Sequence, residues 1–161
     1  MTDVYPPMTI SIRKVAPVTV RAAADADAAE VAGCLAELGY GTPAEVVREK
    51  LVAVGASDAD AVFVATDPAS GTVLGVASVH VLPLFHAPGS LGRLTALAVR
   101  RSAQRRGVGR ALVAAAEAFA WAAGCKRMEV TSGDHRPAAH AFYTAIGYAE
   151  DERRFIKHAT R

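Results

Sequence analysis

The segment 104–110 (QRRGVGR) combines residue types that bind anions. Gly107 and Gly109 stand at the start of an alanine-rich apolar segment with helical spacing. Free N–H groups at a helix start carry partial positive charge, and a glycine lets a phosphate approach the backbone because it has no Cβ. Five arginines fall within eleven positions here: Arg100, Arg101, Arg105, Arg106 and Arg110. The segment predicts a site for a small anionic molecule, with a plain helix start as the alternative.

This glycine pattern differs from two common nucleotide-binding loops. No Lys-Ser or Lys-Thr pair follows Gly109, so the segment is not a Walker loop. The residue three positions after Gly109 is Leu112, so it is not a GxGxxG turn either. Both a nucleoside triphosphate and a dinucleotide on a Rossmann turn are therefore disfavoured.

The elements around this segment alternate between strands and helices. Alternating and helical apolar spacing, with Gly and Pro as breakers, sets their approximate bounds. The predicted strands are 18–22, 61–66, 72–82, 93–99, 126–132 and 153–159, and the predicted helices are 25–40, 42–54, 108–124 and 136–148. This order predicts an α/β (α+β) fold with a mixed central sheet flanked by helices. Residues 1–16 are interpreted as an N-terminal extension, and 17–161 as one domain.

Composition restricts the class of protein. The 161 residues are 52% hydrophobic and 21% charged, which is typical of one globular domain. The net charge of +2 is too small to favour nucleic acid as a partner. Cys34 and Cys125 form no CxxC pair, so neither a metal site nor a disulfide framework is expected. Without a long apolar run or a signal-peptide pattern, we expect a soluble cytoplasmic protein with no membrane partner.

Two motifs, about 30 residues apart and in the right order, resemble those of the GNAT family of acyl-CoA-dependent N-acyltransferases. The letters QRRGVG (104–109) fit the family pattern Gln/Arg-x-x-Gly-x-Gly/Ala, and AHAFYTAIGY (139–148) is similar to its FYxxxGF ending. The resemblance runs from about Val18 to Ile156. It implies the GNAT fold, and transfer of an acetyl group from acetyl-CoA to a primary amine by direct attack in a ternary complex.

The resemblance also implies how coenzyme A is held. Its pyrophosphate would bind the backbone of Arg105, Arg106, Gly107, Val108, Gly109 and Arg110. Its pantetheine arm would pair with the end of the fourth strand, at Leu97, Ala98 and Val99, and an amide near Leu97 would polarise the reacting carbonyl. The family often has a cofactor-contacting asparagine seven residues before its tyrosine. That position is Arg136 here, and Asp134, His135 or Arg136 could substitute for it; we take His135 as the candidate.

Tyr143 matches the family tyrosine that protonates the departing thiolate. A phenol suits that role because it is still protonated at neutral pH. The alternative is a core aromatic, because Tyr143 shares helical spacing with Ala139 and Ile146.

The base that takes the proton of the amine is less clear, because the family carboxylate on the fourth strand is missing. The residues there are Arg93, Leu94 and Thr95. Glu129 is the nearest alternative, although it could also be an arginine-paired surface residue. Three histidines belong to a residue type that titrates near neutrality: His80, His86 and His135. We take Tyr40 and His86 as candidate contacts of the acceptor.

The acceptor itself is not encoded in a motif. A small-molecule amine such as an amino acid, a polyamine or an aminoglycoside-like compound is favoured over a protein amine, because the short chain has no extra peptide-binding segment. The missing carboxylate keeps a non-catalytic coenzyme A sensor as an alternative. Nucleic-acid binding is disfavoured by the modest charge and the few aromatic residues. The resemblance also allows a homodimer.

Overall fold

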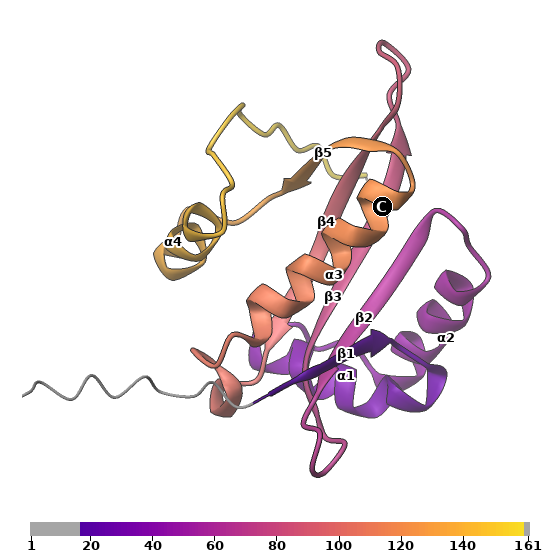
Figure 1. Cartoon of the computed structure of the whole chain (residues 1–161), viewed down its shortest axis with the longest axis vertical. Coiled ribbons are helices and arrows are strands. Elements are labelled where there is room, and N and C mark those ends of the chain that lie inside the picture. The colour runs from indigo at the N-terminus through magenta and orange to yellow at the C-terminus, as the bar shows by residue number, and fades with distance from the viewer. Residues whose placement is uncertain (1–16, 160–161) are drawn as a thin grey trace, which may run out of the picture.

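A single five-stranded sheet forms the centre of the protein. The computed structural model describes residues 17–159, so the predicted extension 1–16 lies outside the described residues. The strands are β1 (Thr19–Ala22), β2 (Asp60–Thr66), β3 (Val73–Pro83), β4 (Ser90–Val99) and β5 (Cys125–Val130), and they lie in that order across the sheet (Figure 1). The first four are antiparallel to their neighbours, and β5 is parallel to β4. The predicted mixed sheet is confirmed.

Helices cover both faces of this sheet (Figure 1). They are α1 (Ala28–Glu37), α2 (Ala44–Gly55), α3 (Val108–Ala122) and α4 (Pro137–Ala145). Successive strand side chains point to opposite faces, so β2, β3 and β4 each supply two hydrophobic cores. On one face α3 packs its buried stripe, which includes Leu112 and Ala116, against Ala77, Val79 and Leu94. The opposite core joins α1 and α2 to the sheet through Val31, Cys34, Val47, Leu51, Val64, Val76 and Ala98.

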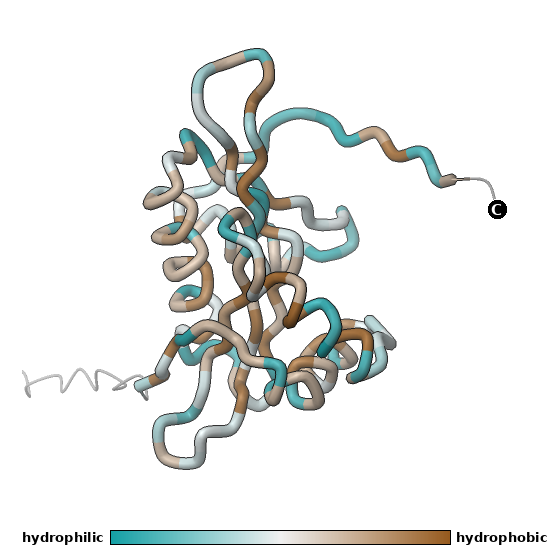
Figure 2. Tube along the Cα trace, turned by 90° about the vertical axis from the view of Figure 1, so that its right-hand side faces the viewer, coloured by the Kyte–Doolittle hydropathy of each residue, from teal (hydrophilic) through white to brown (hydrophobic). Residues whose placement is uncertain are grey.

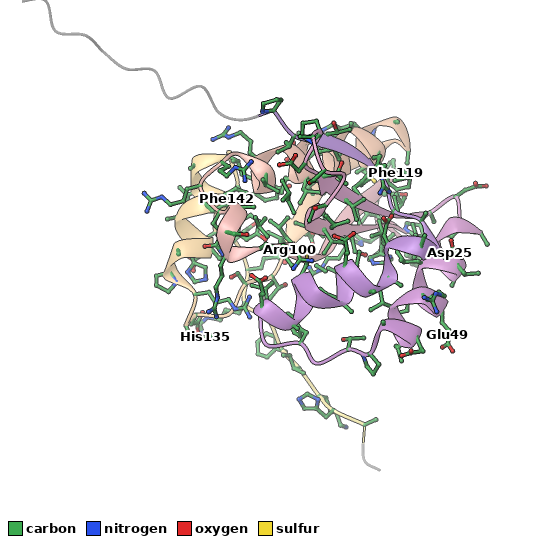
Figure 3. The ribbon with its side chains drawn as sticks, turned by 90° about the horizontal axis from the view of Figure 1, so that it is seen from below. Asp25, Glu49, Arg100, Phe119, His135 and Phe142 are labelled. Atoms are coloured by element: carbon green, nitrogen blue, oxygen red, sulfur yellow. The ribbon has the colours of Figure 1, made fainter. Side chains whose placement is uncertain are left out.

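Arg100, directly after β4, ties α1 to the sheet. Its Nε donates a hydrogen bond of 2.7 Å to the carbonyl oxygen of Val73, at the start of β3. Its guanidinium group also lies 3.6 Å from a carboxylate oxygen of Glu37 and 4.0 Å from one of Glu30, both on α1 (Figure 3). These contacts hold α1 beside the end of β4, where the chain turns toward α3.

Strands β4 and β5 pair along only part of their length. Their last paired residues are Leu94 and Val130, whereas β4 continues to Val99. Beyond Leu94 no described strand pairs with this edge of β4. The pairing of β3 with β4 also shifts between Ser78 and Val79, and Thr95 is the residue of β4 left without a partner in that register. Such a bulge bends a strand and changes where its side chains point. The sheet therefore opens beside residues 95–99.

The predicted last strand, 153–159, is wrong. The described residues after Gly147 form neither helix nor strand, and the end of this segment runs away from the body of the protein (Figure 2). Phe155 is 92% exposed and Ile156 is 60% exposed. The physical reason lies in their spacing, because two adjacent apolar residues in a strand point to opposite faces. This segment therefore has no apolar face that could pack on a core.

Within residues 17–159, no helix is long and apolar enough to cross a membrane.

Candidate active site

The opening between β4 and β5 is a cleft of about 900 Å³. This volume lies in the range of small-molecule sites. Its wall is built from the end of α1, the second half of β4, the turn before α3, the end of β5 and the start of α4. The residues that line it include Tyr40, Thr95, Leu97, Val99, Arg105, Gly107, Val108, Gly109, Arg110, His135, Arg136, Phe142, Tyr143 and Arg154.

The glycine turn lies in this cleft and presents free backbone donors. Gly107 is the N-cap of α3 and has φ of +80°, a conformation that favours glycine. No side chain of the described residues caps this helix start. Ala111 donates the first hydrogen bond of the helix, to the carbonyl oxygen of Gly107. The N–H groups before Ala111 therefore lack intrahelical partners and are available to an anion.

The arginines of this segment separate into two groups. Arg105 and Arg110 line the cleft, and Arg105 has φ of +61°, which is uncommon for a residue with a side chain. Arg106 instead directs its guanidinium group to Asp67, 4.0 Å away, and does not line the cleft. The predicted contribution of Arg106 is thus restricted to its backbone.

The free edge of β4 forms the next wall. Leu97 and Val99, two of the residues predicted to pair with the pantetheine arm, line the cleft. Ala98 is only 1% exposed and packs in the core under α1 and α2, so its side chain is on the opposite face. A free strand edge presents N–H and C=O groups to an extended ligand. The pairing predicted for the pantetheine arm is therefore available along this edge, with Ala98 contributing backbone alone.

Tyr143 reaches the cleft from α4. Its ring packs edge-on against Phe142 and Tyr148, with ring centroids 5.2 and 5.7 Å away. Burial raises the pKa of the Tyr143 phenol above its ordinary value, while the positive charge of Arg136 acts in the opposite direction. In the part of the chain that the structure describes, its hydroxyl makes no hydrogen bond. The cleft therefore contains a protonated hydroxyl that is free to donate.

Tyr40, His135 and Arg136 also line the cleft, and Arg136 contacts the C-terminal end of α1. The guanidinium carbon of Arg136 lies 6.0 Å from the centre of the Tyr40 ring, within reach of a cation–π contact. Arg136 also donates a hydrogen bond of 3.4 Å to the carbonyl oxygen of Leu38. Figure 3 shows His135 and Phe142 on the same side of the molecule, far from Glu49 of α2. The predicted contacts Tyr40 and His135 are thus in the cleft.

Two predicted site residues, Glu129 and His86, do not line the cleft. Glu129 accepts hydrogen bonds from Nη1 of Arg93 at 3.1 Å and from Nε of Arg127 at 2.8 Å. Glu129 is therefore an arginine-paired residue, the alternative given for it by the sequence. His86 lies in the exposed turn that joins β3 to β4, away from the lining residues. Its place in the chain, between two strands, did not indicate how far the hairpin would extend.

Thr95 and Arg154 line the cleft, although the sequence does not predict them as site residues. At Thr95 the sequence shows only that the family carboxylate is missing, and Arg154 belongs to the predicted strand that does not form. In residues 17–159 there is no cluster of three or more His, Cys, Asp or Glu side chains that could hold a metal ion.

Known proteins are similar to this chain in both sequence and fold. The family model of the acetyltransferase (GNAT) family matches residues 32–148. The chain therefore belongs to the GNAT acetyltransferase family. The predicted family and fold are confirmed, and the protein is an N-acetyltransferase.

One relative and two solved structures illustrate the similarity. The chain is 35% identical to the aminoglycoside N(6')-acetyltransferase type 1 of Stenotrophomonas maltophilia over 138 residues, which is 84% of this chain and 88% of the relative. The aminoglycoside N-acetyltransferase AAC(6')-Iy in complex with CoA superposes with a TM-score of 0.78 at 20% identity, over 89% of this chain and 95% of that one. A transcriptional regulator from Bacillus halodurans C-125 has a TM-score of 0.79 at 22% identity, over 89% and 100%. These two structures show a likeness of fold alone.

Proposed function

We propose that this protein transfers the acetyl group of acetyl-CoA to the primary amine of a small molecule by direct attack in a ternary complex. The observation that carries the proposal is the single cleft in which the uncapped start of α3, the free edge of β4 and the Tyr143 hydroxyl meet. The start of α3 offers a site for phosphate, the edge of β4 offers a site for an extended arm, and Tyr143 is a proton donor.

The residues of the cleft fit coenzyme A. Arg105 and Arg110 add full positive charges to the N–H groups of the turn, which suits a pyrophosphate. Residues 95–99 of β4 provide backbone groups for the amide-containing arm. When bound, acetyl-CoA would supply the activated thioester. The chain would align it with the amine, polarise the carbonyl through a β4 amide near Leu97 and donate the Tyr143 proton to the departing sulfur.

Direct attack is supported by the positions of the two cysteines. Cys34 is fully buried in α1, and Cys125, at the start of β5, is 8% exposed. Burial raises the pKa of both thiols, which disfavours the reactive thiolate. Neither lines the cleft. No cysteine is thus placed to carry the acetyl group between the two substrates.

The charge of the cleft indicates the class of acceptor. Among its described lining residues there is no Asp or Glu, whereas Arg136 and Arg154 are present in addition to Arg105 and Arg110. A polycation would meet like charge at this site. The relative from Stenotrophomonas maltophilia is named for aminoglycosides, and an aminoglycoside remains the alternative acceptor. The charge favours an amine that also carries an anionic group, such as an amino acid or an amino sugar phosphate.

The test begins with calorimetric titration of the protein with acetyl-CoA and continues with release of the coenzyme A thiol over a panel of amines. The panel pairs amino acids and an amino sugar phosphate with a polyamine, an aminoglycoside and a lysine-containing peptide. Binding followed by thiol release with a small amine supports the proposal. Release with the peptide alone would assign a protein acceptor. Binding without release on any amine would favour a coenzyme A sensor, and the absence of binding would overturn the interpretation of the cleft.

A further inference from the structure

A polar network connects three strands on the face of the sheet that α1 and α2 cover. Nδ1 of His80, on β3, lies 2.6 Å from Oδ1 of Asp60, on β2. Nε2 of the same ring lies 2.8 Å from Oγ1 of Thr95, on β4. Ser57 donates a hydrogen bond of 2.6 Å to the second oxygen of Asp60. A carboxylate thus contacts an imidazole, which in turn contacts a hydroxyl. Catalytic triads use the same order of groups to move a proton.

The carboxylate determines which nitrogen of His80 carries the hydrogen. The hydrogen bonds from Ser57 and then from His80 lower the pKa of Asp60 below its ordinary value, so this carboxylate is ionised and only accepts. Nδ1 must therefore donate to it. In the neutral ring the other nitrogen, Nε2, is then an acceptor, and it faces the Thr95 hydroxyl.

Thr95 carries this network to the cleft. It is the unpaired residue of the β4 bulge, it is exposed and it lines the same cleft as Tyr143. The hydroxyl of Ser78 also lies near Nε2, at 3.1 Å, but Ser78 does not line the cleft. Of the two hydroxyls, Thr95 is thus both closer to the ring and accessible to a bound amine.

We propose that His80, oriented by Asp60, is the base that deprotonates the acceptor amine, acting through the Thr95 hydroxyl. The inference rests on the acetyl transfer proposed above. An N–H bond of the ammonium group breaks and its proton goes to Oγ1 of Thr95, while the hydroxyl proton of Thr95 goes to Nε2 of His80. The amine becomes neutral, Thr95 is unchanged and the imidazolium is stabilised by the Asp60 carboxylate.

This relay supplies the chemistry that the cleft otherwise lacks. The residues that line the cleft within the described chain include no carboxylate, and Glu129 is held by two arginines. An amine that arrives as an ammonium ion has no lone pair for attack, so its proton needs an acceptor. The His80 side chain is 29% exposed, which leaves it a route for passing the proton on to water.

The charged and titratable groups near His80 come from the strands on either side of it and from the two helices packed on this face. In register with it are Asp60 on β2 and Arg93 on β4, and Arg93 in turn pairs with Glu129 on β5. The packed sides of α1 and α2 contribute the apolar residues of the core and the Cys34 thiol, whose pKa burial raises. The charged groups in register with the ring are therefore one carboxylate and one arginine.

The experiment compares the wild type with His80→Gln, Asp60→Asn and Thr95→Val, using the best amine of the panel. Removal of a base costs about 10²-fold or more in rate. We expect kcat/KM for the amine to fall about 10²-fold in His80→Gln and about 10-fold in the other two variants, with unchanged acetyl-CoA affinity. His140→Gln is the matched control, because His140 is exposed on α4 and outside the cleft lining. Ser78→Ala removes the hydroxyl that does not line the cleft, and its kcat/KM for the amine should fall clearly less than that of Thr95→Val.

The pH profile separates proton transfer from a structural role. At a pH above the pKa of the acceptor amine most of the substrate arrives already neutral, so the loss of kcat/KM in His80→Gln should shrink steadily as pH rises toward that range. A network that only supports the sheet would give the same deficit at every pH, and that result overturns the proposal. Equal losses of kcat/KM in Ser78→Ala and Thr95→Val would also overturn it, and so would a His80→Gln enzyme with the kcat/KM of the wild type. If instead the wild type releases no thiol with any amine, it is the proposed function that fails.

Discussion

A Cβ built on Gly109 would lie 3.3 Å from Cζ of Phe142. The start of α3 and the side of α4 therefore approach each other closely because residue 109 is a glycine. Phe142 precedes Tyr143, and their rings are in edge-on contact. One contact thus couples the proposed phosphate site to the proposed proton donor.

Gly109→Ala should lower activity without a large change in stability. The added methyl group must displace the Phe142 ring, which moves α4 and Tyr143. Alanine also favours the helix by about 1 kcal/mol, which offsets part of the packing cost, so Tm should change little. We expect kcat to fall about 10-fold from misplacement of the donor. The double variant Gly109→Ala/Phe142→Leu should recover most of the rate, and a single variant with wild-type kcat would contradict the coupling.

Gly107→Glu should abolish acetyl-CoA binding in a calorimetric titration. The residue has φ of +80°, where a side chain costs about 1–2 kcal/mol, and the carboxylate would repel the pyrophosphate. The matched control is Gly124→Glu, since Gly124 has φ of +79°, follows the other end of α3 and has open space around it. The control suffers the same backbone strain and should keep its affinity. Micromolar affinity in Gly107→Glu would refute the phosphate site.

Tyr143→Phe should lower kcat about 10- to 100-fold with little effect on acetyl-CoA affinity. Because burial raises the pKa of Tyr143, its phenol stays protonated through the neutral range, and its ionisation should cause no loss of activity below about pH 10. Tyr148→Phe is the comparison, because Tyr148 packs on Tyr143 but donates its hydrogen bond to Glu117, 3.0 Å away. Steady-state kinetics of both variants checks the assignment. A Tyr143→Phe enzyme as fast as the wild type would remove the acid role.

Asp27 provides a test of stability rather than catalysis. It accepts hydrogen bonds of 2.7 and 2.8 Å from the Arg21 guanidinium and one from the Ala24 amide. The hydrogen bonds from Arg21 hold the pKa of Asp27 below its ordinary value; burial opposes this effect and the Ala24 amide adds to it. We expect Asp27→Asn to lower the free energy of unfolding by about 1–2 kcal/mol at neutral pH.

The pH dependence of that difference has a definite sign. A group whose pKa is depressed on folding adds stability above its unfolded value, near 3.9 for an aspartate. The contribution is lost as pH falls through the lower, folded value. Urea unfolding of wild type and Asp27→Asn should therefore converge in strong acid. Asp25→Asn is the control, because Asp25 is exposed and accepts a bond from its neighbour Ala26; a gap for Asp27→Asn that persists at every pH would contradict the assignment.

Glu129→Gln tests the base that the sequence suggested. Its carboxylate is bound to Arg93 and Arg127 and does not line the cleft. The shape of the pH–rate profile should therefore be unchanged. Flattening of the limb that rises with pH would return Glu129 to the role of base and displace His80.

Local properties of the sequence were enough to predict most elements and the glycine turn. The spacing of Val108, Leu112 and Ala116 is a property of neighbouring residues, and so is the need for glycine at 107. The same holds for the β2–β3 hairpin, whose turn residues lie between two apolar runs. These predictions succeeded because helix and turn formation depend on contacts within a few residues.

The tertiary structure alone decided which side chains meet. Asp60, His80 and Thr95 are far apart in the chain, and the register of β2, β3 and β4 together with one bulge brings them into line. The pairing of Glu129 with arginines and the position of Arg154 in the cleft have the same origin. The strand predicted at 153–159 does not form, because a strand needs a neighbouring strand edge to pair with and an apolar face that packs on a core. Strand register and edge pairing depend on residues that are far apart in the sequence. The residue types were therefore enough to predict acetyl transfer, whereas the arrangement of the sheet determines which side chains are close enough to take part in it.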